Sequence, residues 1–159
     1  MHPEGHVEEL VNFVEEVGLF YEDAGMPRLW GRVLGYLLVC EPDLQSAEQL
    51  AQVLHVSRGS ISMCTKALVR TGMVERQTLR GDRRTYFRIR PEAWTGVFED
   101  QIRSTARLRE LAQQGLGLLG NQPPERLRRL EQLQEFTAFY EREIPALLAR
   151  WRSEHQQGT

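Results

Sequence analysis

Apolar and polar residues alternate along the first part of the chain with the period of an α-helix. Apolar side chains recur three and four positions apart, at Val7, Leu10, Val11, Val14 and Val17. This spacing places them on one face and predicts an amphipathic helix that ends near Gly25. The next segment, Leu29 to Val39, is apolar on nearly every side, which indicates a short buried helix with Pro27 in its first turn. Within it, Gly31 and Gly35 would let a neighbouring helix approach closely.

Two further helices are predicted from their capping signals. The sequence Ser-Ala-Glu-Gln at residues 46–49 has the form of a capping box and begins a short helix. Ser57 is placed to cap a second helix that runs to about Thr71. Gly72 follows at the position where a left-handed residue commonly ends a helix.

The pattern then changes to that of β-strands. Val74 to Leu79 and Thr85 to Arg90 are rich in β-forming residues, and they flank Arg-Gly-Asp-Arg-Arg. This arrangement predicts a hairpin with Gly81 and Asp82 at its tip. The sequence shows no other pair of strands.

The rest of the chain returns to helical periodicity. A long helix is expected from Pro91 to Leu119, and Gly120 to Pro124 interrupt it. A final helix continues past Trp151, with a kink expected at Pro145. The predicted fold is therefore mainly α, with one β-hairpin. We expect an N-terminal helix for dimerisation, a winged helix-turn-helix and two long dimerisation helices, at residues 1–26, 27–90 and 91–159.

The link between the two capped helices identifies a DNA-binding arrangement. His55 and Val56 form a tight connection between a short helix and one that begins Ser-Arg-Gly-Ser. This is the pattern of a helix-turn-helix, whose second helix reads the major groove of DNA. A glycine-tipped basic hairpin directly behind it makes the unit a winged helix.

Charge is distributed unevenly along the chain. The net charge of −2 alone argues against nucleic-acid binding, because such domains are usually basic. Between His55 and Arg90, however, nine basic residues face two acidic ones, a local balance of +7. The remaining residues carry 11 basic and 20 acidic side chains, a balance of −9. A basic region on an acidic body attracts a polyanion to one face only.

The candidate DNA contacts lie on the reading helix and the hairpin tip, where side chains can reach phosphates and base edges. They are Ser57, Arg58, Ser60, Ser62, Lys66, Arg80, Arg83 and Arg84. The alternatives are a core helix that is polar outside and a solvated hairpin tip. We expect Asp82 to pair with an arginine and fix the turn, and Arg28 and Arg32 to pair with acidic residues of the body.

The segment from Gly25 to about Pro91 resembles the winged-helix core of MarR-type bacterial transcription regulators. Its GMPR opening and GDRRTYFR wing are most similar to the GbsR-like branch of that family. The resemblance implies a homodimeric DNA-binding regulator whose first and last helices build the dimer interface. It also implies that a wing arginine reaches the minor groove or its phosphates, and it leaves room for a small-molecule effector.

Other functional chemistry has weaker support. Cys40 and Cys64 are too few for a disulfide framework and are expected to be packed small hydrophobes; oxidant sensing would need an exposed thiol of lowered pKa. His2 and His6 are four residues apart, but no further metal ligand is near them. If an effector binds, we expect it near Trp30 and Trp94, between the winged core and the long helices. Separately, the aromatic residues of the helices could cage an organic cation, although helical spacing favours core and interface roles. They are Phe20, Tyr21, Trp30, Trp94, Phe136, Tyr140 and Trp151.

These observations limit the classes of function. No apolar stretch is long enough to span a membrane, and the N-terminus lacks the pattern of a secretory signal, so we expect a cytoplasmic protein. No catalytic constellation, metal set or cofactor motif is visible, which excludes an enzyme. The sequence predicts a sequence-specific transcriptional regulator, a homodimeric repressor that binds a pseudo-palindromic operator in double-stranded DNA. The alternative is a winged-helix adaptor that binds proteins without reading DNA.

Overall fold

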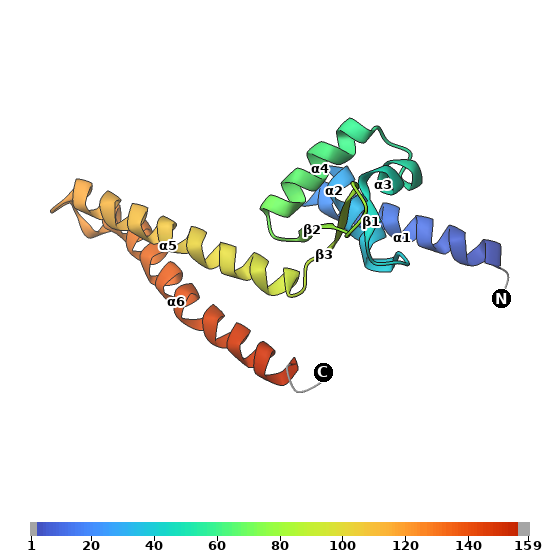
Figure 1. Ribbon diagram of the computed structural model, residues 1–159. Coiled ribbons are helices and arrows are strands. Elements are labelled where there is room, and N and C mark those ends of the chain that lie inside the picture. Colours follow the sequence, from blue (N-terminus) through green and yellow to red (C-terminus); the bar gives the residue numbers. More distant parts are fainter. Residues whose placement is uncertain (1–2, 156–159) are drawn as a thin grey trace. The chain divides into compact units, whose positions relative to one another are not determined.

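The computed structural model describes residues 3–155, and it describes side chains from residue 7 onwards. The chain divides into two compact units, one that runs to Ala93 and one that begins at Trp94. Both are mainly helical, and the first also contains a small antiparallel sheet (Figure 1). The predicted fold class, a mainly α protein built on a winged helix, is therefore confirmed.

The elements of the first unit follow the predicted order, with one addition. Its helices are α1 (Pro3–Asp23), α2 (Arg28–Val39), α3 (Ala47–Val53) and α4 (Arg58–Arg70). Its strands are β1 (Gln45–Ser46), β2 (Val74–Thr78) and β3 (Thr85–Ile89). Pro27 occupies the N-cap position of α2 and not its first turn, because its ψ of 129° is extended.

Helices α1 and α2 pack closely because glycine lies where they cross. A Cβ atom on Gly31 would overlap the backbone oxygen of Val17, and one on Gly35 would lie 3.0 Å from the Cβ atom of Val17. The two glycines therefore let the backbones approach as the sequence predicted. Arg28 and Arg32 reach from α2 to Glu15 of α1, at 2.9 and 2.7 Å, so their expected pairing with acidic residues is confirmed.

The sheet has three strands, and the sequence analysis was wrong to expect only two. β1 pairs with β3, which pairs in turn with β2, so the strand order is β1-β3-β2 and all pairs are antiparallel. β1 contains only two residues, too few to show the alternating pattern by which a strand is recognised. Its residues, Gln45 and Ser46, are both buried.

The predicted capping and turn signals of the helix-turn-helix are present. Ser46 and Gln49 form a complete capping box at the start of α3, and Ser57 caps α4 by accepting a hydrogen bond from the Ser60 amide. Gly72 ends α4 with a φ of 74°. His55, in the turn between α3 and α4, also has a positive φ, of 53°. The inward residues of α4 join the core of the unit and include Ile61, Cys64 and Leu68.

The two cysteines are free, and the buried one behaves as the sequence suggested. Cys64 is 3% exposed, and burial raises the pKa of its thiol to about 12. Cys40 is half-buried, and desolvation raises its pKa as well. A thiolate is the reactive form of cysteine, so neither environment favours oxidant sensing.

The second unit is an antiparallel pair of long helices, α5 (Ala93–Leu119) and α6 (Pro124–His155). Arg109 lies 3.0 Å from Glu141, both near the middle of their helices, and Arg152 near the end of α6 lies 2.5 Å from Glu99 near the start of α5. This pairing is that of antiparallel helices. Pro145 lies inside α6 without ending it. Across residues 3–155, no helix is both long and apolar enough to cross a lipid bilayer.

The close crossing of α1 and α2 predicts the effect of adding one methyl group. Gly31→Ala would place a Cβ atom against backbone that cannot move aside, and overpacking of this kind costs about 1 to 3 kcal/mol. Urea denaturation at fixed protein concentration measures the loss. The control is Gly117→Ala in α5, where no atom lies within 4 Å and a gain of up to about 1 kcal/mol is expected from helix propensity. Unchanged stability of Gly31→Ala would contradict the packing described.

Candidate nucleic-acid interface

Helix α4 presents one exposed face opposite its buried one. Gly59, Met63, Lys66 and Arg70 follow one another at spacings of four, three and four residues, and all four are exposed. Because each residue turns the helix by about 100°, these positions form a single outward stripe. Ser62 is also exposed and lies beside this stripe.

The serines at the start of α4 are engaged with each other. The Ser57 hydroxyl accepts the Ser60 amide at 3.0 Å, and the two hydroxyl oxygens lie 2.8 Å apart. Ser60 is half-buried, since it lies at the edge of the outward face. Of the three candidate serines, the structure therefore leaves Ser62 facing outwards and uses Ser57 and Ser60 to cap the helix.

Arg58 begins α4 and is ion-paired with Glu48 of α3. Its side chain remains 77% exposed, so the pair lies at the surface. A surface pair of this kind is weak, because water screens both charges. Arg58 can therefore exchange Glu48 for a phosphate or a base edge at small cost.

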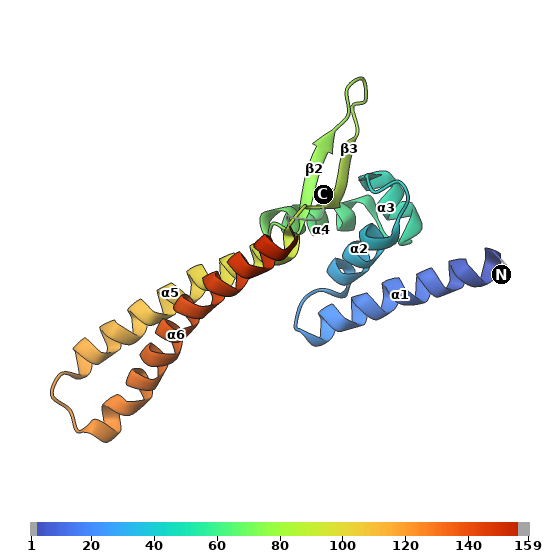
Figure 2. The ribbon, with the colours of Figure 1, turned by 90° about the horizontal axis from the view of Figure 1, so that it is seen from below.

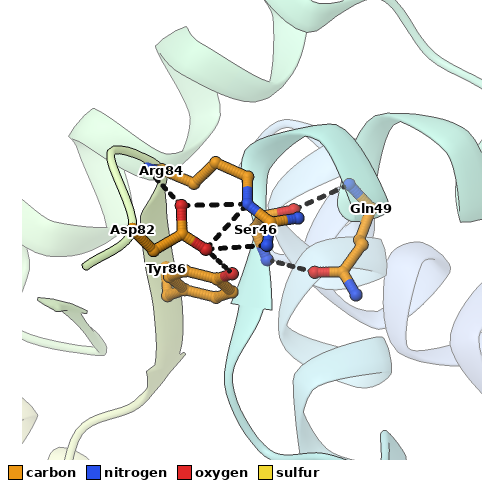
Figure 3. A network of polar contacts seen from close by, with 5 residues as sticks. All are labelled: Ser46, Gln49, Asp82, Arg84 and Tyr86. Carbon is orange, nitrogen blue, oxygen red and sulfur yellow. Dashed lines mark hydrogen bonds and ion pairs between the residues drawn. The ribbon is translucent and has the colours of Figure 1, made fainter. Parts of the chain in front are cut away.

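The wing is fixed by a cluster of Asp82, Arg84 and Tyr86 (Figure 3). One Asp82 oxygen accepts hydrogen bonds from the Arg84 amide at 2.9 Å and from its Nε at 3.1 Å; the other accepts the Arg84 guanidinium and the Tyr86 hydroxyl, each at 2.7 Å. These bonds, chiefly from the Arg84 side chain, hold the pKa of Asp82 well below its usual value. The expected role of Asp82 in fixing the turn is confirmed, and Arg84 is the arginine it binds.

The two other wing arginines are free to meet a polyanion. Arg80 and Arg83 are exposed at the tip, and neither side chain has a polar partner among the described residues. The hairpin carries them away from the helices of the first unit (Figure 2). The structure therefore separates Arg84, which orders the wing, from Arg80 and Arg83, which it presents.

A groove of about 350 Å³ runs between α4 and the sheet. Ser62, Lys66 and Val69 line its helix side, and Arg76, Thr85 and Phe87 line its sheet side. Lys66 and Arg76 bring two positive charges to its walls. These two charges favour a phosphate oxygen at this groove.

Part of the basic region is neutralised within the protein. Arg88 pairs with Glu75 at 2.5 Å and with Asp43 at 3.5 Å, and this pairing raises the pKa of Arg88. With Arg58 and Arg84 also paired, six of its nine cations have no ion pair within residues 3–155. They are Lys66, Arg70, Arg76, Arg80, Arg83 and Arg90.

Two residues of this surface, Met63 and Arg76, were not predicted from the sequence. Met63 was overlooked because it is apolar, although the period that placed Ser62 and Lys66 outside also places Met63 there. Arg76 was counted in the basic region but not as a contact. The alternation of β2 carries the signal, since Arg76 is exposed between the less exposed Glu75 and Gln77.

The two effector candidates lie in different units. Trp30 belongs to α2 and packs against the core of the first unit. Trp94, half exposed, lines an almost wholly apolar cavity of about 330 Å³ in the second unit, with Phe98, Leu147 and Trp151. A site shared by the two tryptophans stays a prediction. His2 and the side chain of His6 lie outside the described residues.

Comparison with known proteins gives consistent matches over most of the chain. A family model described as "MmpR5-like MarR family transcriptional regulator" matches residues 92–154, and one described as "MarR family" matches residues 24–85. The HTH-type transcriptional regulator MmpR5 of Mycobacterium tuberculosis is 43% identical over 143 residues, which are 90% of this chain and 87% of that protein. A crystal structure of a transcriptional regulator is 42% identical with a TM-score of 0.82, and the match covers 91% of this chain and 99% of that one.

The cluster at the wing predicts the effect of neutralising Asp82. Asp82→Asn removes a negative charge from the polyanion-facing tip, so simple attraction would strengthen DNA binding. We expect weaker binding, by about two- to tenfold, because a loosened wing has to be ordered on binding. Fluorescence anisotropy with labelled duplex DNA measures the affinity.

The matched control is Asp100→Asn, which breaks an exposed ion pair with Arg103 on α5 and should leave DNA affinity unchanged. The pKa of Asp82 is lowered in the folded protein, so the contribution of its carboxylate to stability is fully present above the pKa of an unfolded aspartate, about 3.9. That contribution is lost as the pH falls from this value through the lower pKa of the folded state. Tighter DNA binding by Asp82→Asn would contradict the expected weakening, because it would mean that the charge of the wing, and not its order, determines the affinity.

Proposed function

The chain belongs to the MarR family of transcriptional regulators, with MmpR5-like relatives, and we propose that it is a homodimeric repressor of a pseudo-palindromic operator, released by a small-molecule effector. As a member of this family it is a DNA-binding transcriptional regulator and not an enzyme. Membership of the GbsR-like branch stays a prediction. Acting on the cell's DNA, the protein would work in the cytoplasm, as the sequence led us to expect.

One observation carries the proposed mode of DNA binding: the exposed stripe of α4 and the unpaired wing arginines belong to one compact unit. In this mode α4 enters the major groove, and Arg58, Ser62 and Lys66 make polar contacts with bases or phosphates. Arg80 and Arg83 reach the minor groove or its phosphates. Ser57 and Ser60 support DNA binding indirectly, because they cap α4. Arg84 also supports it indirectly, because it holds the wing in shape. The six cations without an ion pair make the adaptor alternative weaker, because binding to a protein alone does not require them.

The proposed dimer is supported by apolar surface on the terminal helices. Leu19 and Phe20 of α1 are exposed, although both are large and hydrophobic. Apart from the residues that line the cavity at Trp94, the second unit exposes six residues of this kind on α5 and α6, and apolar surface of this extent marks a binding surface. They are Val97, Leu108, Leu111, Leu118, Phe136 and Phe139.

The proposed effector site is supported by the apolar cavity at Trp94. Its volume of about 330 Å³ is within the range of small-molecule sites. In the dimer, the two copies of α4 must have the spacing that fits the operator. An effector releases DNA only if it binds more tightly to the dimer when α4 has a different spacing. The walls of this cavity are almost wholly apolar, so the ligand would be largely apolar as well.

Arg83→Ala tests whether the wing supplies charge. Each phosphate contact contributes about 0.9 to the slope of log affinity against log salt concentration, so a dimer that loses two should lose about 1.8. Operator and random DNA should be weakened alike, because phosphates carry no sequence information. Titrations at several salt concentrations measure the slope. Arg128→Ala, an exposed arginine of α6, is the matched control and should leave the slope unchanged.

Ser62→Ala tests whether the reading helix supplies specificity. A lost base contact should cost about 1 to 3 kcal/mol on the operator, relax specificity at one position and leave the salt slope unchanged. Competition binding with operator variants measures both effects. Loss of discrimination in Arg83→Ala with an unchanged slope would contradict the assignment of charge to the wing and sequence to the helix.

The proposed dimer predicts the mass of the protein in solution. Light scattering at micromolar concentration should give twice the chain mass of 18.4 kDa. The two copies of α4 should then lie about 34 Å apart, one turn of DNA, so that they enter successive major grooves. A monomeric mass would exclude the proposed operator symmetry while leaving DNA binding by a single winged helix open.

A further inference from the structure

Met63 is the most exposed large hydrophobic residue among the described residues of the first unit, at 74%. A single exposed apolar side chain needs no explanation by itself. The position of this one is what matters, because it lies on the outward stripe of α4 between Gly59 and Lys66. It is nearer the centre of that stripe than Ser62, which faces the groove beside the sheet.

The neighbours of Met63 leave its side chain accessible. A long side chain on a helix points towards the N-terminal end, which for Met63 is the turn that contains Gly59. Gly59 has no side chain, and the nearest atom to a Cβ built there is the Ser57 hydroxyl oxygen, at 3.7 Å. The N-terminal half of a reading helix is also the part that meets base edges. A thioether is therefore held where a base edge would lie.

The chemistry of the major groove offers one suitable partner for such a group. Base edges there present hydrogen-bond donors and acceptors, and the exception is the C5-methyl group of thymine. Met63 cannot donate a hydrogen bond, and packing against a polar edge would leave that edge without its water. We infer that Met63 contacts a thymine methyl group in each half-site and so helps to determine which operator is bound. This inference rests on the proposed DNA-binding mode.

The test removes the methyl group from the DNA and the thioether from the protein. An operator is first selected from random duplex DNA. Each thymine of its half-sites is then replaced in turn by uracil, first in one half-site and then at the matching position of both. At one position, affinity for the wild-type protein should fall about fourfold per half-site, the value of one buried methyl group, and about 15-fold when both half-sites are changed. Met63→Ala should bind the original operator more weakly and should be insensitive to uracil at that position.

Two further variants separate the contact from general effects. Met63→Leu keeps an apolar side chain and should retain the sensitivity to uracil. Met26→Ala removes a methionine from the link between α1 and α2, 37% exposed, and should behave as the wild type. Thermal unfolding of each variant checks that it folds, which is expected because Met63 is exposed and alanine favours helices.

The outcomes also distinguish this inference from the proposed function. If the wild-type protein shows no salt-dependent binding to DNA, both are wrong. If it binds a selected operator but no thymine position shows a methyl effect that Met63→Ala removes, only the role of Met63 is overturned. An operator without thymine in its half-sites would overturn that role as well.

Discussion

The DNA-binding surface depends on Ser46, a buried residue that belongs to two structures at once. Its side chain caps α3, and in the sheet it lies opposite Tyr86 of β3. Tyr86 in turn donates its hydroxyl hydrogen bond to Asp82 at the wing (Figure 3). The helix-turn-helix and the wing are thus joined through one short strand. Ser46 and Tyr86 are buried, and no buried polar side-chain atom among the described residues lacks a hydrogen-bond partner, so α4 and the wing are held in one unit.

This constraint gives the basic residues different tasks. Cations that pair within the protein, such as Arg84 and Arg88, hold the sheet and the wing in shape, and those left unpaired are available to phosphates. A count of charges therefore overstates the part of the basic region that DNA would meet. The same reasoning applies to the serines of α4, since Ser57 and Ser60 satisfy backbone and hydroxyl groups at the helix start before any ligand arrives.

Sequence periodicity predicted most of the fold, because helix faces, caps and the hairpin tip are local signals. The capping box at Ser46 and the left-handed Gly72 are two examples. What it missed depends on contacts distant in sequence or on segments too short to show a pattern. β1 has two residues, and the pairing of Arg58 with Glu48 appears only when α3 and α4 are placed together. Met63 was missed for a different reason, since only hydrogen-bonding residues were considered as readers of DNA.

Methylation interference on the selected operator shows whether α4 and the wing act as one body that reads two grooves. Dimethyl sulfate marks guanine N7 in the major groove and adenine N3 in the minor groove. We expect major-groove marks to interfere under α4, and minor-groove marks to interfere under the wing about five base pairs away, which is half a helical turn. Interference confined to one groove, or without a fixed spacing between the two sets, would contradict it.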